Sequence, residues 1–346
     1  MNRFLIAFLI FSILIVGFIF LKTPRFTFDS QFSHEPYGEQ LVYLKDLVQD
    51  QGPKEAYRNF SRELKNGLYP EEIQHAHAHT FGKVVYELYD TNGISFCDDE
   101  FSYGCVHEIT GEALLEYGVD IIPTLGTVCK SAQFSSKNVC QHGIGHGMLA
   151  SLGYAPQDRN TALEMCNRDL PDSDPIYGCN GGVFMEYYDH TMLRDGSRLI
   201  PQSENLLDLC NGINPHFAEP CSFRLPQWWL GSELFTNDYR PLEERLTRIE
   251  DMCVQASSIL DITYATCLEG LGNVIATYTD FDSKRSAEMC FMLTDLAHLY
   301  DCIKGAAYRL IDVVPEETAI NICDLLSDSA SSLLCKEEVR ALLEQD

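Results

Sequence analysis

The sequence predicts an all-α protein of about eight helical hairpins, stacked as an α-solenoid or, as the alternative, closed into an α/α toroid. Three observations support this prediction. The second cysteine of each consecutive pair recurs at intervals of 33 to 46 residues, which is typical of helix-hairpin repeats. The segments before the cysteines have helical apolar spacing, and no segment alternates as a strand would.

The cysteines predict both the covalent framework and the compartment. All 14 lie beyond residue 96 in seven consecutive pairs, and the absence of CxxC argues against structural zinc, iron–sulfur and haem sites. The predicted disulfides are Cys97 with Cys105, Cys129 with Cys140, Cys166 with Cys179, Cys210 with Cys221, Cys253 with Cys267, Cys290 with Cys302, and Cys323 with Cys335. Because disulfides persist in oxidising compartments, we expect a periplasmic, extracellular or lumenal domain.

The first residues predict a membrane anchor. Residues 4–20 carry no charge and are almost entirely apolar, and as a helix they would span about 26 Å. No small-x-small cleavage site follows, so residues 1–21 are predicted to be an uncleaved signal-anchor transmembrane helix. Residues 22–40, with two prolines and no helical period, are the predicted linker to an extracytoplasmic helical-repeat domain over residues 41–346.

The charge restricts the partners. The chain has 51 acidic and 25 basic residues, a formal net charge of −26. This argues against nucleic acid as a partner and suits cations or metal ions better. The simpler interpretation is an acidic surface that only keeps the domain soluble.

Histidines occupy matching positions in the first three hairpins. When the repeats are aligned on the second cysteine, His75, His107 and His142 fall at the third position, and His79 and His146 at the seventh. Equivalent positions of stacked repeats line one surface, so we expect these five imidazoles to converge. Imidazole is the commonest metal ligand, and a pair four residues apart on a helix can bind one ion. The pattern predicts a divalent transition-metal site, with zinc, iron, manganese, nickel and copper all open.

Two carboxylates accompany the histidines. Glu108 follows His107, and Glu186 lies in the next repeat, so either could be the general base of a metal-dependent hydrolase or oxidase. HExxH is absent, because Gly111 stands where its second histidine would be. The competing interpretation is that the histidines only hydrogen-bond the preceding loops. Whether the chain is an enzyme stays open.

One repeat differs in sequence from the others and suggests another function. It contains Arg224 and both tryptophans, Trp228 and Trp229, which form either a ligand platform or core aromatics that fill a kink. The alternative hypothesis is a membrane-tethered, non-enzymatic scaffold that binds a protein, peptide or glycan on its concave face. A metal centre requires the imidazoles to converge, whereas a scaffold requires dispersed histidines and an exposed tryptophan pair.

Overall fold

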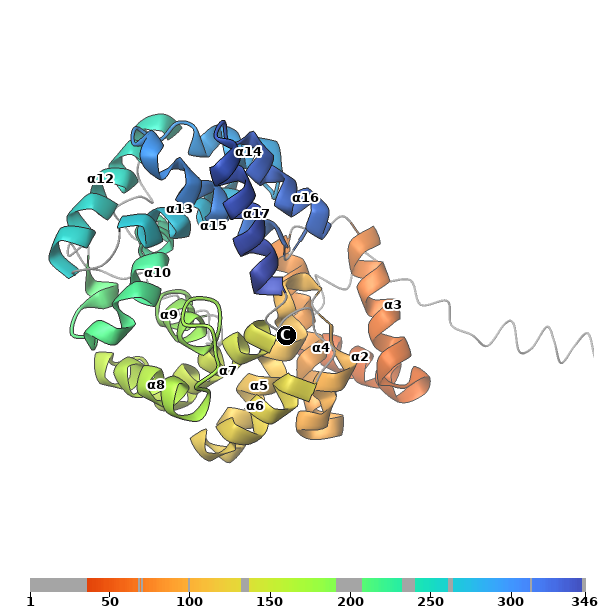
Figure 1. Cartoon of the computed structure of the whole chain (residues 1–346). Helices are drawn as coiled ribbons and strands as arrows, with labels where there is room; N and C mark the ends of the chain where they lie inside the picture. Colours follow the sequence, from red (N-terminus) through yellow and green to blue (C-terminus); the bar gives the residue numbers. More distant parts are fainter. Residues whose placement is uncertain are drawn as a thin grey trace, which may run out of the picture.

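The computed structural model describes residues 36–67, 69, 71–98, 100–131, 137–190, 207–231, 240–260, 264–311 and 313–343. Every secondary-structure element in these ranges is an α-helix or a short 3-10 helix, which confirms the all-α class (Figure 1). The predicted anchor over residues 1–21 and most of the predicted linker lie outside the described residues. None of the helices that are described is both long and apolar enough to cross a membrane.

In the described part of the chain, three α-helices precede the first disulfide. They are α2 (Tyr37–Gln51), α3 (Pro53–Asn66) and α4 (Glu71–Tyr89). Helix α2 begins within the segment predicted as linker, before Leu41. Gly52, at φ 78°, ends α2 in a conformation that side chains disfavour, and Pro53 opens α3 at the first helical position, where its missing N–H is not needed.

Each later unit joins a first helix to a second through a pair of cysteines. In the unit of Cys97 and Cys105 the first helix is only a 3-10 segment, so the predicted hairpin is shorter there. The pairs are η2 (Asp90–Phe96) and α5 (Gly104–Tyr117), α6 (Ile122–Ser131) and α7 (Lys137–Leu152), α8 (Pro156–Asp169) and α9 (Cys179–Asp189), η5 (Asp208–Cys210) and α10 (Ala218–Gly231), α12 (Leu242–Leu260) and α13 (Tyr264–Tyr278), α14 (Ser283–Cys290) and α15 (Leu299–Ile311), and η8 (Ile322–Leu325) and α17 (Ser329–Leu343). The remaining elements are η3 (Phe101–Tyr103), η4 (Val119–Ile121), η6 (Pro215–Phe217), η7 (Leu296–His298) and α16 (Glu316–Asn321).

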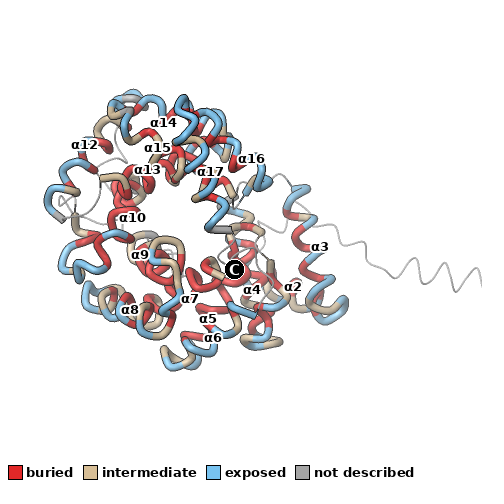
Figure 2. The backbone as a smooth tube through the Cα atoms, in the orientation of Figure 1, coloured by how far each residue is buried: buried red, intermediate tan, exposed pale blue. Residues whose placement is uncertain are grey.

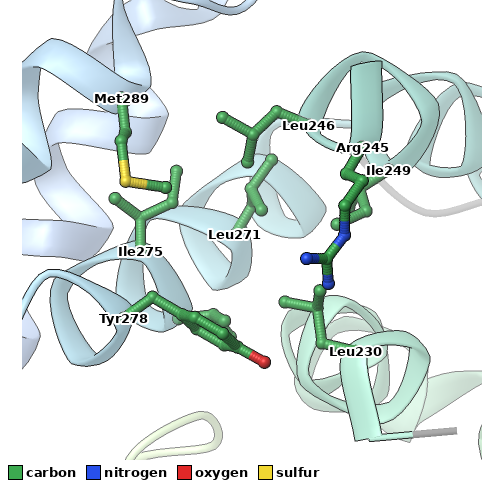
Figure 3. A pocket seen from close by; sticks show the side chains of 9 residues that line it. Leu230, Arg245, Leu246, Ile249, Leu271, Ile275, Tyr278 and Met289 are labelled. Atoms are coloured by element: carbon green, nitrogen blue, oxygen red, sulfur yellow. The ribbon is translucent and has the colours of Figure 1, made fainter. Parts of the chain in front are cut away.

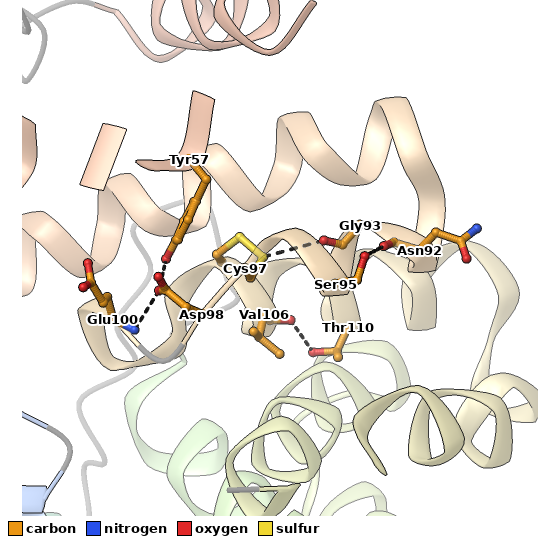
Figure 4. The surroundings of a disulfide bond; sticks show 10 residues. Tyr57, Asn92, Gly93, Ser95, Cys97, Asp98, Glu100, Val106 and Thr110 are labelled. Atoms are coloured by element: carbon orange, nitrogen blue, oxygen red, sulfur yellow. Dashed lines mark hydrogen bonds between the residues drawn. A yellow bond between two sulfur atoms is a disulfide. The ribbon is translucent and has the colours of Figure 1, made fainter. Parts of the chain in front are cut away.

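All seven predicted disulfides are present, with Cα–Cα distances of 5.5 to 5.8 Å, and no cysteine is left over. Near the disulfide between Cys97 and Cys105, the Tyr57 hydroxyl of α3 donates a hydrogen bond to Asp98 Oδ1 at 2.6 Å (Figure 4). The disulfides suggest an oxidising, extracytoplasmic or secreted compartment, as the sequence predicts.

The second helices form the inner layer of the fold. They contact one another in chain order, from α4 through α5, α7, α9, α10, α13 and α15 to α17, along a curved path (Figure 1). Helices α5 and α7 are buried over most of their length, whereas α8 and α12 mix buried and exposed positions (Figure 2). The hydrophobic core therefore lies between the second helices and an outer layer of first helices.

Glycines let the second helices approach closely where the histidines lie. A Cβ on Gly182 of α9 would collide with the carbonyl oxygen of His142, and one on Gly143 of α7 would lie 2.8 Å from the ring of His107. Only a residue without a side chain fits such approaches. The inner helices are thus held close enough for side chains of α4, α5 and α7 to share one site.

A small cavity lies between α10, α12 and α13 (Figure 3). Leu230, Leu246, Leu271 and Ile275 line it, together with the aromatic side chain of Tyr278. Its volume is about 30 Å³. Since one water needs roughly 10–15 Å³ of such space, this cavity has room for a water or two and not for an organic ligand.

Candidate metal centre

Three neighbouring inner helices bring the five predicted histidines together. Helix α4 carries His75 and His79 one turn apart, with ring centroids 4.6 Å apart, and α7 carries His142 and His146 at 4.9 Å. Helix α5 packs against both and places His107 between the pairs. The His107 centroid lies 6.0 and 6.1 Å from the first pair and 5.8 and 5.3 Å from the second. The convergence expected from the repeat alignment is therefore seen.

In the first pair, hydrogen bonds fix which nitrogen carries the proton. His75 Nδ1 lies 2.8 Å from the carbonyl oxygen of Phe101, and His79 Nδ1 lies 3.0 Å from Glu108 Oε2. A carbonyl or carboxylate oxygen can only accept, so each Nδ1 is the donor and each neutral ring keeps a lone pair on Nε2. The two Nε2 atoms face each other at 3.1 Å. Two ligands of a tetrahedral zinc ion at 2.0–2.1 Å stand about 3.4 Å apart, so this spacing is close to that of a chelating pair.

The second pair repeats this arrangement. His142 Nδ1 lies 3.2 Å from the carbonyl oxygen of Tyr177, and His146 Nδ1 lies 2.9 Å from Glu186 Oε2. Glu186 is held in turn by the hydroxyl of Tyr154, which donates to its Oε1. Both Nε2 atoms of this pair therefore also carry lone pairs.

His107 completes a three-histidine group with the first pair. One ring nitrogen each from His75, His79 and His107 lies within 4.8 Å of the others. His107 is 7% exposed, and its buried Nε2 makes no hydrogen bond within the described part of the chain. A buried nitrogen without a partner is unfavourable, and a bound cation would remove that penalty. The residues present therefore fit a metal ion.

Burial keeps three of these imidazoles neutral. It lowers the pKa of His75 to about 3, with the neighbouring His79 as the next cause. Burial and the nearby histidines hold the pKa of His107 well below its usual range. For His142 the pKa is lowered in the same way, first by burial, then by His146 and by the charge of Arg224. Neutral imidazole is the form that binds metals, so the site is ready for an ion at neutral pH.

The two predicted carboxylates touch the histidines. Glu108 and Glu186 are 4% and 0% exposed, and each accepts the Nδ1 proton of a histidine on the preceding inner helix. Such bonds orient an imidazole and raise its basicity as a ligand. Their predicted role as general bases stays a prediction.

The tryptophans are core residues, which supports the second of the two interpretations of this segment, aromatics that fill a kink. Trp228 is 6% exposed and Trp229 is fully buried in the hydrophobic core. Two large apolar rings are stabilised more by burial than by exposure, which is the physical reason for their position in the core. Arg224 is also buried, with its guanidinium beside Phe223 and its charge acting on His142.

Sequence reasoning missed the backbone acceptors of the site. Phe101 and the two residues after it have left-handed φ values of 55°, 51° and 61°, and this turn presents the Phe101 carbonyl to His75. Non-glycine residues in this region are strained by roughly 1–3 kcal/mol each. Phe101 stands four residues before its cysteine and Tyr177 two before its own, so no common spacing marks them.

Comparisons of the chain with protein-family models, with curated proteins and with solved structures find no match.

Proposed function

We propose that this protein is an extracytoplasmic metal-binding protein whose centre holds a divalent transition metal on His75, His79 and His107. The observation that supports it most is the pair of Nε2 atoms 3.1 Å apart on rings whose Nδ1 atoms are already engaged as donors. Lone pairs at this distance repel unless a cation lies between them. His107 supplies a third nitrogen within 4.8 Å.

The donor set suits some metals more than others. Three imidazoles favour zinc, copper, iron or nickel, whereas manganese prefers more oxygen ligands. Three protein ligands also leave a coordination position for water or substrate, as in catalytic zinc sites. This open position supports a metal-dependent hydrolase or oxidase as the reaction class, with Glu108 or Glu186 as the proposed base.

The arrangement of the chain around this centre is part of the proposal. We infer that the units form a curved repeat array, because successive second helices contact one another in chain order, as they do in an α-solenoid and in a closed α/α toroid alike. Contacts of Tyr177, just before α9, with Glu269 of α13 and Tyr308 of α15 favour the toroid. We also propose that residues 4–20 anchor this domain to a membrane. The scaffold hypothesis has less support, since the tryptophan pair it needed as an exposed surface is buried.

Metal content tests the proposal. We would produce the protein in an oxidising compartment, remove loosely bound ions by dialysis, and measure metals by plasma mass spectrometry. The wild-type protein is expected to retain at least one ion per chain. The double variant His75→Ala with His79→Ala is expected to retain one ion fewer than the wild type, because only His107 of the triad would remain. The control His216→Ala, which removes an exposed histidine on η6, is expected to retain as many ions as the wild type.

Circular dichroism and thermal unfolding would show that each variant is folded. If folded wild-type protein retains none of the five candidate metals after incubation with each in turn, the proposal is wrong.

A further inference from the structure

We propose that the centre holds two metal ions, with a second one bound by His142 and His146. This inference rests on the proposed function, since it adds an ion to a site already proposed to bind one.

The two histidine pairs are built alike. Each takes the third and seventh positions of its repeat, on α4 for His75 and His79 and on α7 for His142 and His146. In each pair the first histidine bonds a carbonyl oxygen just before the next inner helix, 2.8 Å away in one pair and 3.2 Å in the other. The second histidine bonds a glutamate on that next helix, at 3.0 and 2.9 Å.

Because the contacts are the same, the histidines of the second pair are oriented to bind a metal ion in the same way as those of the first. These contacts fix the tautomer and ring orientation in both pairs, so that both present Nε2 lone pairs. The second pair is also the more buried, with His142 9% and His146 2% exposed. The two imidazoles lie side by side in the interior with their Nδ1 atoms oriented by acceptors, which is the same arrangement that the first pair offers to a metal ion.

One shared ion would not satisfy all five rings. The ligand nitrogens that lie within 4.8 Å of one another in the described chain are those of His75, His79 and His107, and His142 and His146 do not belong to that group. Zinc takes four ligands in most protein sites, and this triad with one water already provides four. The second pair is therefore assigned an ion of its own.

The second ion would be bound by two imidazoles and would have at least two further coordination positions. The ring of His107 lies between the two pairs, and its centroid is 5.3 Å from that of His146. The two ions would therefore bind on either side of this ring. Two divalent cations and the guanidinium of Arg224 together carry more positive charge than the two buried glutamates, Glu108 and Glu186, can balance. An anionic ligand, such as hydroxide, is therefore expected to complete the coordination.

Zinc stoichiometry tests the second ion. The full chain would be stripped with a chelator, loaded with excess zinc, desalted, and measured by native mass spectrometry. We expect two zinc ions per wild-type chain, and two in the control His216→Ala. The variants His142→Ala with His146→Ala and His75→Ala with His79→Ala are each expected to retain one.

The outcomes separate this inference from the proposed function. One ion in the wild type, or two ions that survive removal of His142 and His146, would overturn the second site and leave the first intact. No ion in the wild type would overturn both. If a double variant does not fold, the wild-type stoichiometry and the less disruptive His142→Gln and His146→Gln variants still decide the question.

Discussion

At the scale of single residues, the proposed metal centre depends on hydrogen bonds that four of its imidazoles make through Nδ1, away from the nitrogen that would bind the ion. Besides the proposed role of one of them as a base, Glu108 and Glu186 position the histidines, because each accepts the Nδ1 proton of a histidine and so turns Nε2 toward the site. Removing such a partner typically weakens metal affinity 10- to 100-fold. The ligand set and its partners therefore act together.

Glu108→Gln is expected to weaken zinc binding roughly tenfold, because the neutral amide oxygen still accepts from His79 but no longer raises its basicity. Competition with a chromophoric chelator would measure the affinity. Glu164→Gln changes an exposed carboxylate on α8 and serves as the matched control. Equal affinities in the two variants would show that the Glu108 carboxylate does not support a bound ion.

At the scale of elements, glycines set the distance between inner helices. Gly305 of α15 faces α13 so closely that a Cβ would collide with the carbonyl oxygen of Glu269. A backbone atom cannot move aside as a flexible side chain can, so the helices would have to separate. The same kind of contact lets α4, α5 and α7 bring the histidines together.

Gly305→Ala is expected to lower the free energy of unfolding by about 1–3 kcal/mol, the usual effect of overpacking. Chemical denaturation would measure it. Gly38→Ala in α2 meets nothing within 4 Å and is expected to be neutral or slightly stabilising, since alanine is the better helix former. If Gly305→Ala leaves the free energy of unfolding unchanged, the inner helices are less tightly packed than described.

At the scale of the whole molecule, seven disulfides join the inner layer to the outer one. Each closes a short loop, with cysteines 8 to 14 residues apart in sequence. The bonds link neighbouring helices of one unit, while packing between successive inner helices links one unit to the next. Stability therefore comes from covalent links within units and from packing between them.

Replacing the Cys253–Cys267 disulfide with two alanines is expected to lower the free energy of unfolding by about 3 kcal/mol, because the unfolded chain gains the freedom that the loop had restricted. Thermal and chemical denaturation without reductant would measure the loss. A variant as stable as the wild type would indicate that packing alone holds this unit.

The features that could be predicted from the sequence are those that recur at a regular spacing. The cysteine pairs and the convergence of His75, His107 and His142 follow from alignment of the units, because equivalent positions face the same side of stacked hairpins. The carbonyls of Phe101 and Tyr177 could not be predicted, since loop conformation follows no repeat. The burial of Trp228 and Trp229 depends on tertiary contacts that local pattern does not report.

X-ray absorption spectroscopy of the zinc-loaded protein tests the central claim most directly. It reports the atoms bound to the ion and their distances. We expect imidazole nitrogens at about 2.0–2.1 Å, with the multiple-scattering pattern of histidine rings, weakened in the His75→Ala with His79→Ala variant. Zinc bound by oxygen atoms alone would contradict a metal centre built on these histidines.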